Sequence, residues 1–323
     1  MLNNKTTLYQ RSKSVNIFAQ QLLGKYLPVL EEALKEHLPL SAARGTELLN
    51  QALLYSIFPG GKRMRPIFAL LGGNIVSAQI EGTLIIACAV EYIHTASLLL
   101  DDLPSMDNST LRRGRTALHE VFGEEIAILS AVALLNKSYE LFARAEAMMN
   151  SKSNGRLVIE AAQAIGEKGM IAGQASDLWD RQEVASCSLP EEVFLKTTGL
   201  MVLTLSAAAI AAKTREVDIV ALRLYGEHLG TAFQLLDNAV DHFEDGGEAS
   251  DLPNARRQKA FNTLETAGEE LLRHFNQSQS AMALVEISDS IFRRYGLQVP
   301  AGSVVYPVKD LDLAEPDKRY GKQ

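Results

Sequence analysis

Apolar side chains recur at intervals of three and four residues along most of the chain, the spacing of one face of an α-helix. No stretch of useful length alternates apolar and polar residues as a strand does. The chain is therefore expected to be all-α. The pattern predicts helices over residues 14–36, 46–58, from Pro66 onward, 83–100, 116–149, 156–171, 190–213, 216–245, 255–277 and 279–295.

Short polar segments separate these predicted helices, and neither a Pro-rich linker nor an internal repeat divides the chain. The pattern favours one helical domain over residues 1–296. Beyond it, the helical period is lost and Pro and Gly become frequent. We expect residues 297–323 to form an irregular C-terminal tail.

Composition and charge narrow the classes of function. The 323 residues are 47% hydrophobic and 22% charged, enough apolar material for one large core. A formal net charge of -7 argues against general nucleic-acid binding, so an anionic ligand must be met by local cations. The longest apolar run, Met201 to Ala212, falls short of the roughly 20 residues that cross a bilayer. With no apolar leader in the first residues, a cytoplasmic protein without stable membrane insertion is expected.

Three carboxylates stand where the most apolar predicted helix ends, in the segment LLLDDLPSMDN. Asp101, Asp102 and Asp107 would repel one another beside buried surface unless a cation lay between them. Oxygen ligands of this kind suit Mg²⁺, which is commonly shared between protein carboxylates and substrate phosphates. The alternative is a solvated acidic helix end.

A second acidic pair, Asp237 and Asp241 in FQLLDNAVDHFED, is spaced four residues apart and so shares one helical face. Alone it would be an ordinary exposed face. As a counterpart to the first motif, it is a candidate for the other half of a site with several metal ions.

Cations gather in three segments: Lys62, Arg63 and Arg65 in GGKRMRP, Arg112, Arg113 and Arg115 in LRRGR, and Lys196 in FLKTTG. Each could be a solvated surface cluster, but beside acidic motifs they suit a polyphosphate bridged by metal. His94 precedes Asp101 by seven residues, about two helical turns, and could reach the same pocket. No Walker loop, GxGxxG, GxSxG or HExxH motif supports other common chemistries.

Taken in order, the segments GGKRMRP, EYIHTASLLLDDLPSMDNSTLRRGR, IAGQASDL, LKTTG and GTAFQLLDNAVD resemble the trans-isoprenyl diphosphate synthase (polyprenyl synthetase) family. The resemblance implies the isoprenoid synthase fold, a single large helical bundle around a central cavity, and a homodimer. It also implies a prenyltransferase that condenses isopentenyl diphosphate with an allylic diphosphate by Mg²⁺-assisted ionisation.

The resemblance assigns site residues by position in the motifs. The implied ligands of Mg²⁺ are Asp101, Asp102, Asp107 and Asp237, with Asp241 acting through water or in support. The implied shell of the allylic diphosphate is Arg112, Lys196 and Gln234, and Thr197 would help to stabilise the carbocation. The implied ligands of isopentenyl diphosphate are Lys62, Arg65, His94 and Arg113.

Product length is expected to depend on the side chains just before the first acidic motif. Ala96 and Ser97, five and four residues before Asp101, are both small. Family members that stop at fifteen carbons tend to carry an aromatic residue at this level. The resemblance therefore favours geranylgeranyl diphosphate, with 20 carbons, or a longer product.

The sequence departs from the family pattern in its second half. Asn238 replaces the middle carboxylate of the second motif, Ala131-Val132 replaces a Gly-Asp pair, and Leu100 stands where a polar residue is frequent. The usual Gly-Lys-Asp and Lys-x-Thr segments are missing, although the segment beginning at Arg256 offers other cations.

These departures leave two alternatives. The chain could be a non-catalytic regulatory or binding subunit that pairs with an active homologue. A class I terpene cyclase is less favoured, because GGKRMRP and His94 offer a site for isopentenyl diphosphate that a cyclase does not need.

Overall fold

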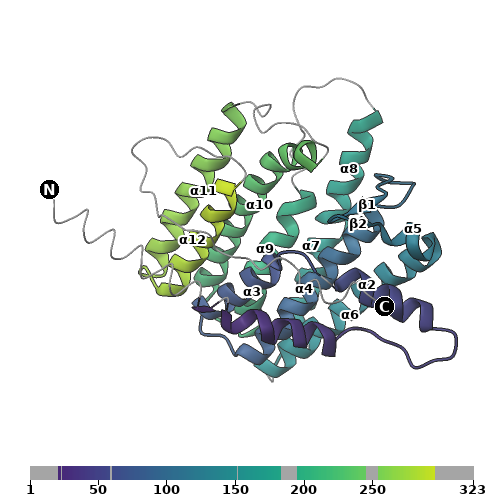
Figure 1. The fold of residues 1–323 in the computed structure, drawn as a ribbon. Coiled ribbons are helices and arrows are strands. Elements are labelled where there is room, and N and C mark those ends of the chain that lie inside the picture. Colours follow the sequence, from purple (N-terminus) through teal and green to yellow (C-terminus); the bar gives the residue numbers. More distant parts are fainter. Residues whose placement is uncertain are drawn as a thin grey trace.

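The computed structural model describes residues 21–22, 24–58, 60–150, 152–182, 195–244 and 254–294, without side chains at 179–182, 236–244, 254–261 and 291–294. Helices make up most of this part of the chain (Figure 1), which confirms the all-α prediction. A helix over residues 24–36 comes first. The elements that follow are α2 (Glu47–Ile57), α3 (Met64–Ile75), α4 (Ile80–Asp101), β1 (Leu111–Arg112), β2 (Arg115–Thr116), α5 (Leu118–Phe122), α6 (Glu124–Met149), α7 (Arg156–Ile165), α8 (Met170–Gln182), α9 (Leu195–Ala211), α10 (Glu216–Glu244), α11 (Asn254–His274) and α12 (Gln279–Arg294).

Helix α4 lies at the centre of the bundle and carries the first acidic motif at its end. It packs against α3, α6 and α9, while α9 packs against α3 and α10. Side chains on nearly all sides of α4 are buried, among them Tyr92, Ile93 and Ala96. A helix apolar around its whole circumference is stable only inside a core. The packing therefore fixes where the carboxylates at the end of α4 emerge.

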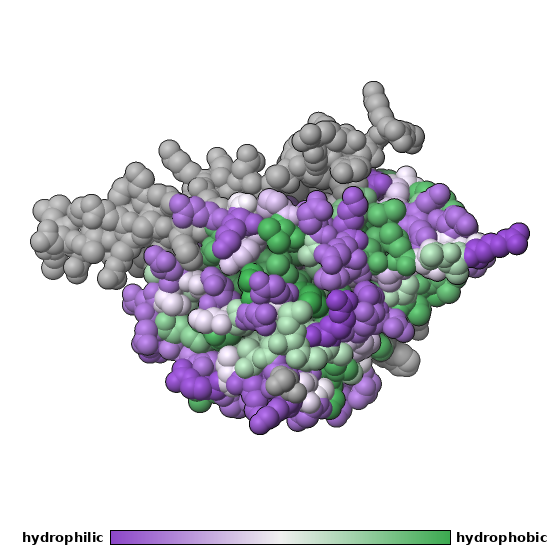
Figure 2. Space-filling view, turned by 90° about the horizontal axis from the view of Figure 1, so that it is seen from below, coloured by the Kyte–Doolittle hydropathy of each residue, from purple (hydrophilic) through white to green (hydrophobic). Residues whose placement is uncertain are grey.

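By length and composition alone, α4 and α6 could cross a membrane. Helix α4 does not contain the longest apolar run of the sequence, because Glu91 and His94 interrupt its apolar residues. In α4, 72% of the most apolar window is buried inside the protein, as in the core helix of a globular protein; in α6 the share is 39%. On the face seen in Figure 2, hydrophilic side chains surround small apolar patches.

Two of the predicted helices are each divided in the structure. The helix predicted over 116–149 is broken at Gly123, whose φ of +89° suits glycine, into α5 and α6. The helix predicted over 156–171 ends at Ile165. Helix α8 begins at Met170 and continues to Gln182, well beyond the predicted bound. The backbone folds back between them so tightly that a Cβ at Gly169 would lie 1.9 Å from the Ala164 carbonyl oxygen. The apolar spacing continues through both breaks, so the period alone could not show them.

The strands β1 and β2 form a hairpin that the sequence pattern did not predict, because two residues per strand are too few to show alternation. Arg112 pairs with Arg115, and the two residues between them, Arg113 and Gly114, have φ of 54° and 70°. Positive φ at both positions is typical of a type I′ turn, which twists to match the strands. This turn directs Arg112 toward Asp102 and Arg113 toward His94.

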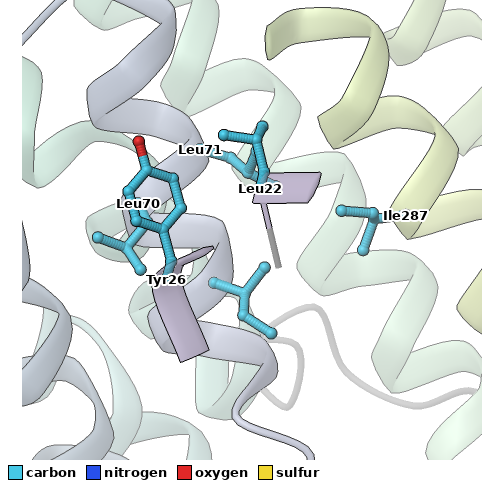
Figure 3. Close-up of a pocket in the computed structure, with 6 residues that line it drawn as sticks. Leu22, Tyr26, Leu70, Leu71 and Ile287 are labelled. Atoms are coloured by element: carbon cyan, nitrogen blue, oxygen red, sulfur yellow. The ribbon is translucent and has the colours of Figure 1, made fainter. Parts of the chain in front are cut away.

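The helix over residues 24–36 is fastened to the bundle by polar and apolar contacts. The buried hydroxyl of Tyr92 donates a hydrogen bond of 2.5 Å to the Leu34 carbonyl oxygen. Side chains from Leu22, this helix, α3 and α12 enclose a gap of about 10 Å³ (Figure 3). That volume is at most about what one water needs, and its walls offer little polarity, so it is a packing defect and no ligand site. Its lining is Leu22, Tyr26, Ile67, Leu70, Leu71 and Ile287.

The predicted division into one domain and a tail stays a prediction. Buried apolar residues from Leu22 to Ile287 belong to one hydrophobic core cluster. Helix α12 ends at Arg294, and the tail predicted over 297–323 lies outside the described residues, as does the Ser14 start of the first predicted helix.

Candidate active site

The carboxylates of the first acidic motif are held close together by the loop that follows α4. Asp101 is the last residue of α4 and Asp102 caps it. The loop then folds back, so that the backbone N–H of Asp107 donates to the Asp101 carbonyl oxygen at 2.8 Å and that of Ser109 donates to the Asp102 carbonyl oxygen at 3.2 Å. These bonds satisfy carbonyls that the end of a helix leaves open. They also bring the three aspartates to one end of α4, as the sequence predicts.

Arg112 is paired with the buried carboxylate Asp102. Its Nε and Nη2 atoms donate to Asp102 Oδ1 at 2.8 and 2.5 Å. The Asp102 side chain is 3% exposed, and a buried carboxylate requires such a partner. The hairpin at Arg113 and Gly114 is what turns Arg112 back toward the end of α4.

Lys196, at the start of α9, joins the acidic motif to α8. Its Nζ lies 3.7 Å from Asp101 Oδ2 and 3.4 Å from Asp177 Oδ2. Burial raises the pKa of Asp101, and the neighbouring Asp107 raises it further, whereas the Lys196 ammonium opposes both. The lysine therefore stabilises the ionised form of a carboxylate that burial and its neighbour disfavour.

Thr197 and Gln234 contact each other across the α9–α10 interface. The Thr197 hydroxyl donates to Gln234 Oε1 at 2.5 Å, and Gln234 is buried. Close approach of these helices depends on Gly230, where a Cβ would lie 2.6 Å from Thr198 Cα. The structure thus places two predicted site residues together, directly after Lys196 in α9.

A second cation cluster surrounds His94, two turns before the acidic motif. Arg65 Nη1 and Arg113 Nη2 lie 3.1 and 3.3 Å from His94 Nε2. A guanidinium can only donate, so Nε2 accepts and the ring carries its proton on Nδ1. Burial and the guanidinium of Arg65 hold the pKa of His94 well below its usual value. The ring is therefore neutral. Lys62, which is exposed, lies three residues before Arg65, just ahead of α3.

The two predicted chain-length residues lie on α4 between these clusters. Ala96 is fully buried, and the Ser97 hydroxyl is turned back to donate to the His94 carbonyl oxygen at 2.9 Å. Both side chains are small, so neither adds bulk at this level of α4.

The second acidic motif falls outside the described side chains. Asp237 and Asp241 lie in α10, three and seven positions after Gln234, and the structure describes only their backbone. In α11, likewise, the structure describes only the backbone of Arg256, Arg257 and Lys259. Among the side chains that are described, no three ligands of His, Cys, Asp or Glu converge on one point. The predicted metal ligands therefore stay a prediction.

Two residues of α8 belong to the site and were not singled out from the sequence. Asp177 contacts Lys196, and Gln174 precedes it by one turn with both amide atoms buried and without a hydrogen-bond partner in the described part of the chain. Their segment, IAGQASDL, carried the family resemblance, but only the fold reveals that Asp177 reaches Lys196. Buried amides without partners are rare and call for a ligand or water.

The described residues thus place two cation clusters along the C-terminal part of α4. One surrounds His94, and the other lies among the carboxylates at the end of the helix. Such an arrangement suits the binding of phosphorylated compounds beside an apolar helix.

Comparison with known proteins identifies the family. Residues 46–251 match the family "Polyprenyl synthetase". The geranylgeranyl diphosphate synthase of Pantoea ananas is 36% identical over 267 residues, covering 81% of this chain and 85% of that protein. The farnesyl diphosphate synthase of Geobacillus stearothermophilus is 36% identical over 229 residues, covering 69% of this chain and 75% of the other. The chain belongs to the polyprenyl synthetase family, a family of prenyltransferases.

Solved structures agree with this assignment. A farnesyl/geranylfarnesyl diphosphate synthase from Zymomonas mobilis superposes with a TM-score of 0.74 at 28% identity, covering 87% of this chain and 99% of that one. A geranyltransferase from Legionella pneumophila gives 0.73 at 30% identity with the same coverage. The predicted isoprenoid synthase fold is confirmed.

Proposed function

We propose that this protein elongates an allylic diphosphate with isopentenyl diphosphate, and that it releases geranylgeranyl diphosphate or a longer product. The observation that carries this proposal is the separation of the cations into two clusters along α4. Arg112 and Lys196 lie with the carboxylates, whereas Arg65 and Arg113 lie around neutral His94, two turns away. Two diphosphates need two such clusters, while a cyclase needs only one.

The first cluster suits the allylic diphosphate together with Mg²⁺. Asp101, Asp102 and Asp107 offer only carboxylate oxygens, the ligands that Mg²⁺ prefers, and Asp237 and Asp241 would add ligands from α10. When bound, Mg²⁺ would neutralise negative charge on the departing diphosphate. Arg112 and Lys196 now neutralise Asp102, Asp101 and Asp177, and would turn to the diphosphate oxygens as metal takes over the carboxylates.

Chain growth then requires no nucleophile from the protein. The allylic C–O bond breaks and diphosphate leaves with the electron pair. The C4 carbon of isopentenyl diphosphate attacks the allylic cation, and the departed diphosphate accepts the proton whose loss forms the new double bond. Thr197, which donates to Gln234 across the α9–α10 interface, would help to stabilise the cation, and Gln234 would complete the shell of the allylic diphosphate. Lys62, Arg65, His94 and Arg113 would hold the second diphosphate.

Product length follows from the size of Ala96. Relatives include both farnesyl and geranylgeranyl diphosphate synthases, so the fold leaves the length open. Ala96→Tyr should shorten the product by at least one five-carbon unit, because a ring would occupy the level just below Asp101. Chromatography of the dephosphorylated products measures this. An unchanged length distribution would exclude Ala96 from the wall of the product channel.

We also propose a homodimer formed through α6, working in the cytoplasm. Ile128, Leu129 and Val132 lie on one side of α6, and the latter two are each 53% exposed. Adjacent large apolar side chains at this exposure mark an interaction surface. Leu129→Glu should convert the dimer to a monomer in light scattering, whereas a wild-type chain that is monomeric would contradict the assembly.

The direct test incubates the purified chain with Mg²⁺, labelled isopentenyl diphosphate and each allylic diphosphate in turn. Elongation without a partner is expected. Asp101→Ala should abolish it, while Glu81→Ala, which removes an exposed carboxylate at the other end of α4, should leave it intact. Equal activity of both variants would place the chemistry elsewhere.

A second candidate function is that of a non-catalytic subunit. Asn238 in the second motif and Ala131-Val132 in α6, where the family carries Gly-Asp, favour it. The same assay separates the candidates. Inactivity that an active homologue relieves would indicate the subunit, whereas hydrocarbon released from geranylgeranyl diphosphate alone would indicate a cyclase.

A further inference from the structure

We propose that Arg63 is a positioning residue that holds the isopentenyl-side cation cluster in place through Glu31 and Glu91. This inference rests on the proposed function, because it assumes that Lys62, Arg65 and Arg113 bind a diphosphate. Arg63 itself points away from that cluster and into the protein, so its part would be indirect.

The guanidinium of Arg63 joins three separate elements. Its Nη1 donates to Glu91 Oε1 of α4 at 2.8 Å, and its Nη2 donates to the Ile57 carbonyl oxygen at the end of α2, also at 2.8 Å. Its Nε and Nη2 donate to both carboxylate oxygens of Glu31, in the helix over 24–36, at 2.7 and 3.1 Å. The planar fork of arginine satisfies all these acceptors at once, which a lysine cannot do.

The backbone at Arg63 has a conformation that the buried side chain must maintain. Its φ and ψ of 53° and 33° are left-handed, which costs a residue with a Cβ about 1–2 kcal/mol. This residue caps α3 and stands between Lys62 and Arg65, so its conformation sets the directions in which those two side chains leave the chain. Loss of the side-chain anchor would let the turn relax.

The two glycines before the turn make room for two guanidinium groups. A Cβ at Gly60 would lie 1.9 Å from Arg63 Cζ, and a Cβ at Gly61 would lie 2.7 Å from Arg113 Cζ. Arg63 and Arg113 therefore pack against the same short segment, one residue apart. A shift of Arg63 would be passed to Arg113 through this segment, and from Arg113 to His94, which it contacts at 3.3 Å.

Charge balance gives the network a second effect. Glu31 and Glu91 carry two negative charges, and the buried guanidinium of Arg63 carries one positive charge. The network therefore has one net negative charge, which offsets the surrounding cations. Burial lowers the pKa of Arg113 and Glu91 opposes this, so Glu91 helps to keep Arg113 charged. The cluster can then stay assembled before an anion arrives, which is the condition for preorganised binding.

The experiment compares Glu31→Gln with wild type, since the Glu31 side chain is 40% exposed and its neutralisation leaves the buried Arg63–Glu91 pair intact. Steady-state kinetics and calorimetric titration with isopentenyl diphosphate are measured on the full chain. The KM and Kd for isopentenyl diphosphate should rise about fivefold, within the coupling expected inside one ion-pair network. The KM for the allylic diphosphate and kcat should not change. Arg63→Lys should show the same pattern more strongly.

Arg215→Gln serves as the matched control, because it breaks a similar arginine–carboxylate pair, between exposed Arg215 and buried Asp218 at the start of α10. It should leave both KM values unchanged. If Glu31→Gln changed the KM values for both substrates equally, or changed neither, the positioning role would be overturned. Elongation by wild type in the same assay would still support the proposed function. Conversely, wild type that binds isopentenyl diphosphate without elongating it, with Glu31→Gln binding more weakly, would refute the function and retain the positioning role. Wild type that binds no isopentenyl diphosphate would overturn both.

Discussion

Gly173→Ala tests whether the contact between α8 and α9 sets the position of Lys196. A Cβ at Gly173 would lie 2.2 Å from the backbone nitrogen of Lys196 and 2.7 Å from its Cα. Both atoms belong to the backbone, so no side-chain rotation can relieve the overlap. The two helices must move apart instead.

The size of that movement follows from the contact distances. Ordinary contacts of a Cβ begin at 3.4 Å, which is 1.2 Å beyond the distance to the Lys196 nitrogen. A displacement of about 1 Å of a catalytic group lowers the rate about 100-fold. Overpacking of this kind also destabilises a protein by about 1–3 kcal/mol. We therefore expect kcat for elongation to fall about 100-fold while the protein remains folded.

Gly24→Ala is the matched control, because Gly24 is helical and, among the described residues, no atom beyond its own stretch of helix lies within 4 Å of its Cβ position. Alanine there should stabilise the protein by about 0.5–1 kcal/mol and leave kcat unchanged. Elongation rates and urea unfolding are measured for both variants. A Gly173→Ala enzyme with wild-type kcat would show that the distances of Lys196 to Asp101 and Asp177 do not limit catalysis.

Two further predictions concern charge. The pKa of His94 is well below 6.5 in the folded protein, whereas an unfolded histidine titrates near pH 6.5. Protons therefore bind the unfolded state preferentially. The free energy of unfolding should fall by about 1.4 kcal/mol for each pH unit below 6.5. His94→Asn should remove this part of the slope in urea unfolding at pH 7.5 and 5.5, and an unaltered slope would contradict a neutral ring. Arg112→Met should leave buried Asp102 unpaired and cost about 3–5 kcal/mol. Mg²⁺ should then raise the melting temperature of this variant more than that of wild type, and no such difference would argue against metal at Asp102.

The helices could be predicted from the sequence because apolar spacing reflects burial, and burial dominates this fold. The all-α class and most helix positions follow from that spacing. What it could not show are interruptions made by backbone geometry: Gly123 breaks a continuous apolar period through its positive φ, and the tight return at Gly169 separates α7 from α8. The hairpin at Arg113-Gly114 was missed for the same reason, since a two-residue strand has no period.

The candidate site was predicted unevenly, for physical reasons. Asp101 and Asp102 stood out because carboxylates directly after a buried helix are conspicuous in any sequence. Asp177 did not, because its relation to Lys196 depends on the approach of α8 to α9 at Gly173, which is a tertiary contact. Arg63 looked like one more cation of its turn, although its left-handed backbone sends its side chain inward.

The pairing of cations with carboxylates inside the site determines how substrate binding must proceed. Arg112 pairs with Asp102, and Lys196 pairs with Asp101 and Asp177, so turning either cation toward a diphosphate would weaken its contact with a carboxylate. A buried carboxylate without a partner is costly, and a divalent cation can replace that partner. Metal and allylic diphosphate should therefore bind together, each raising the affinity for the other.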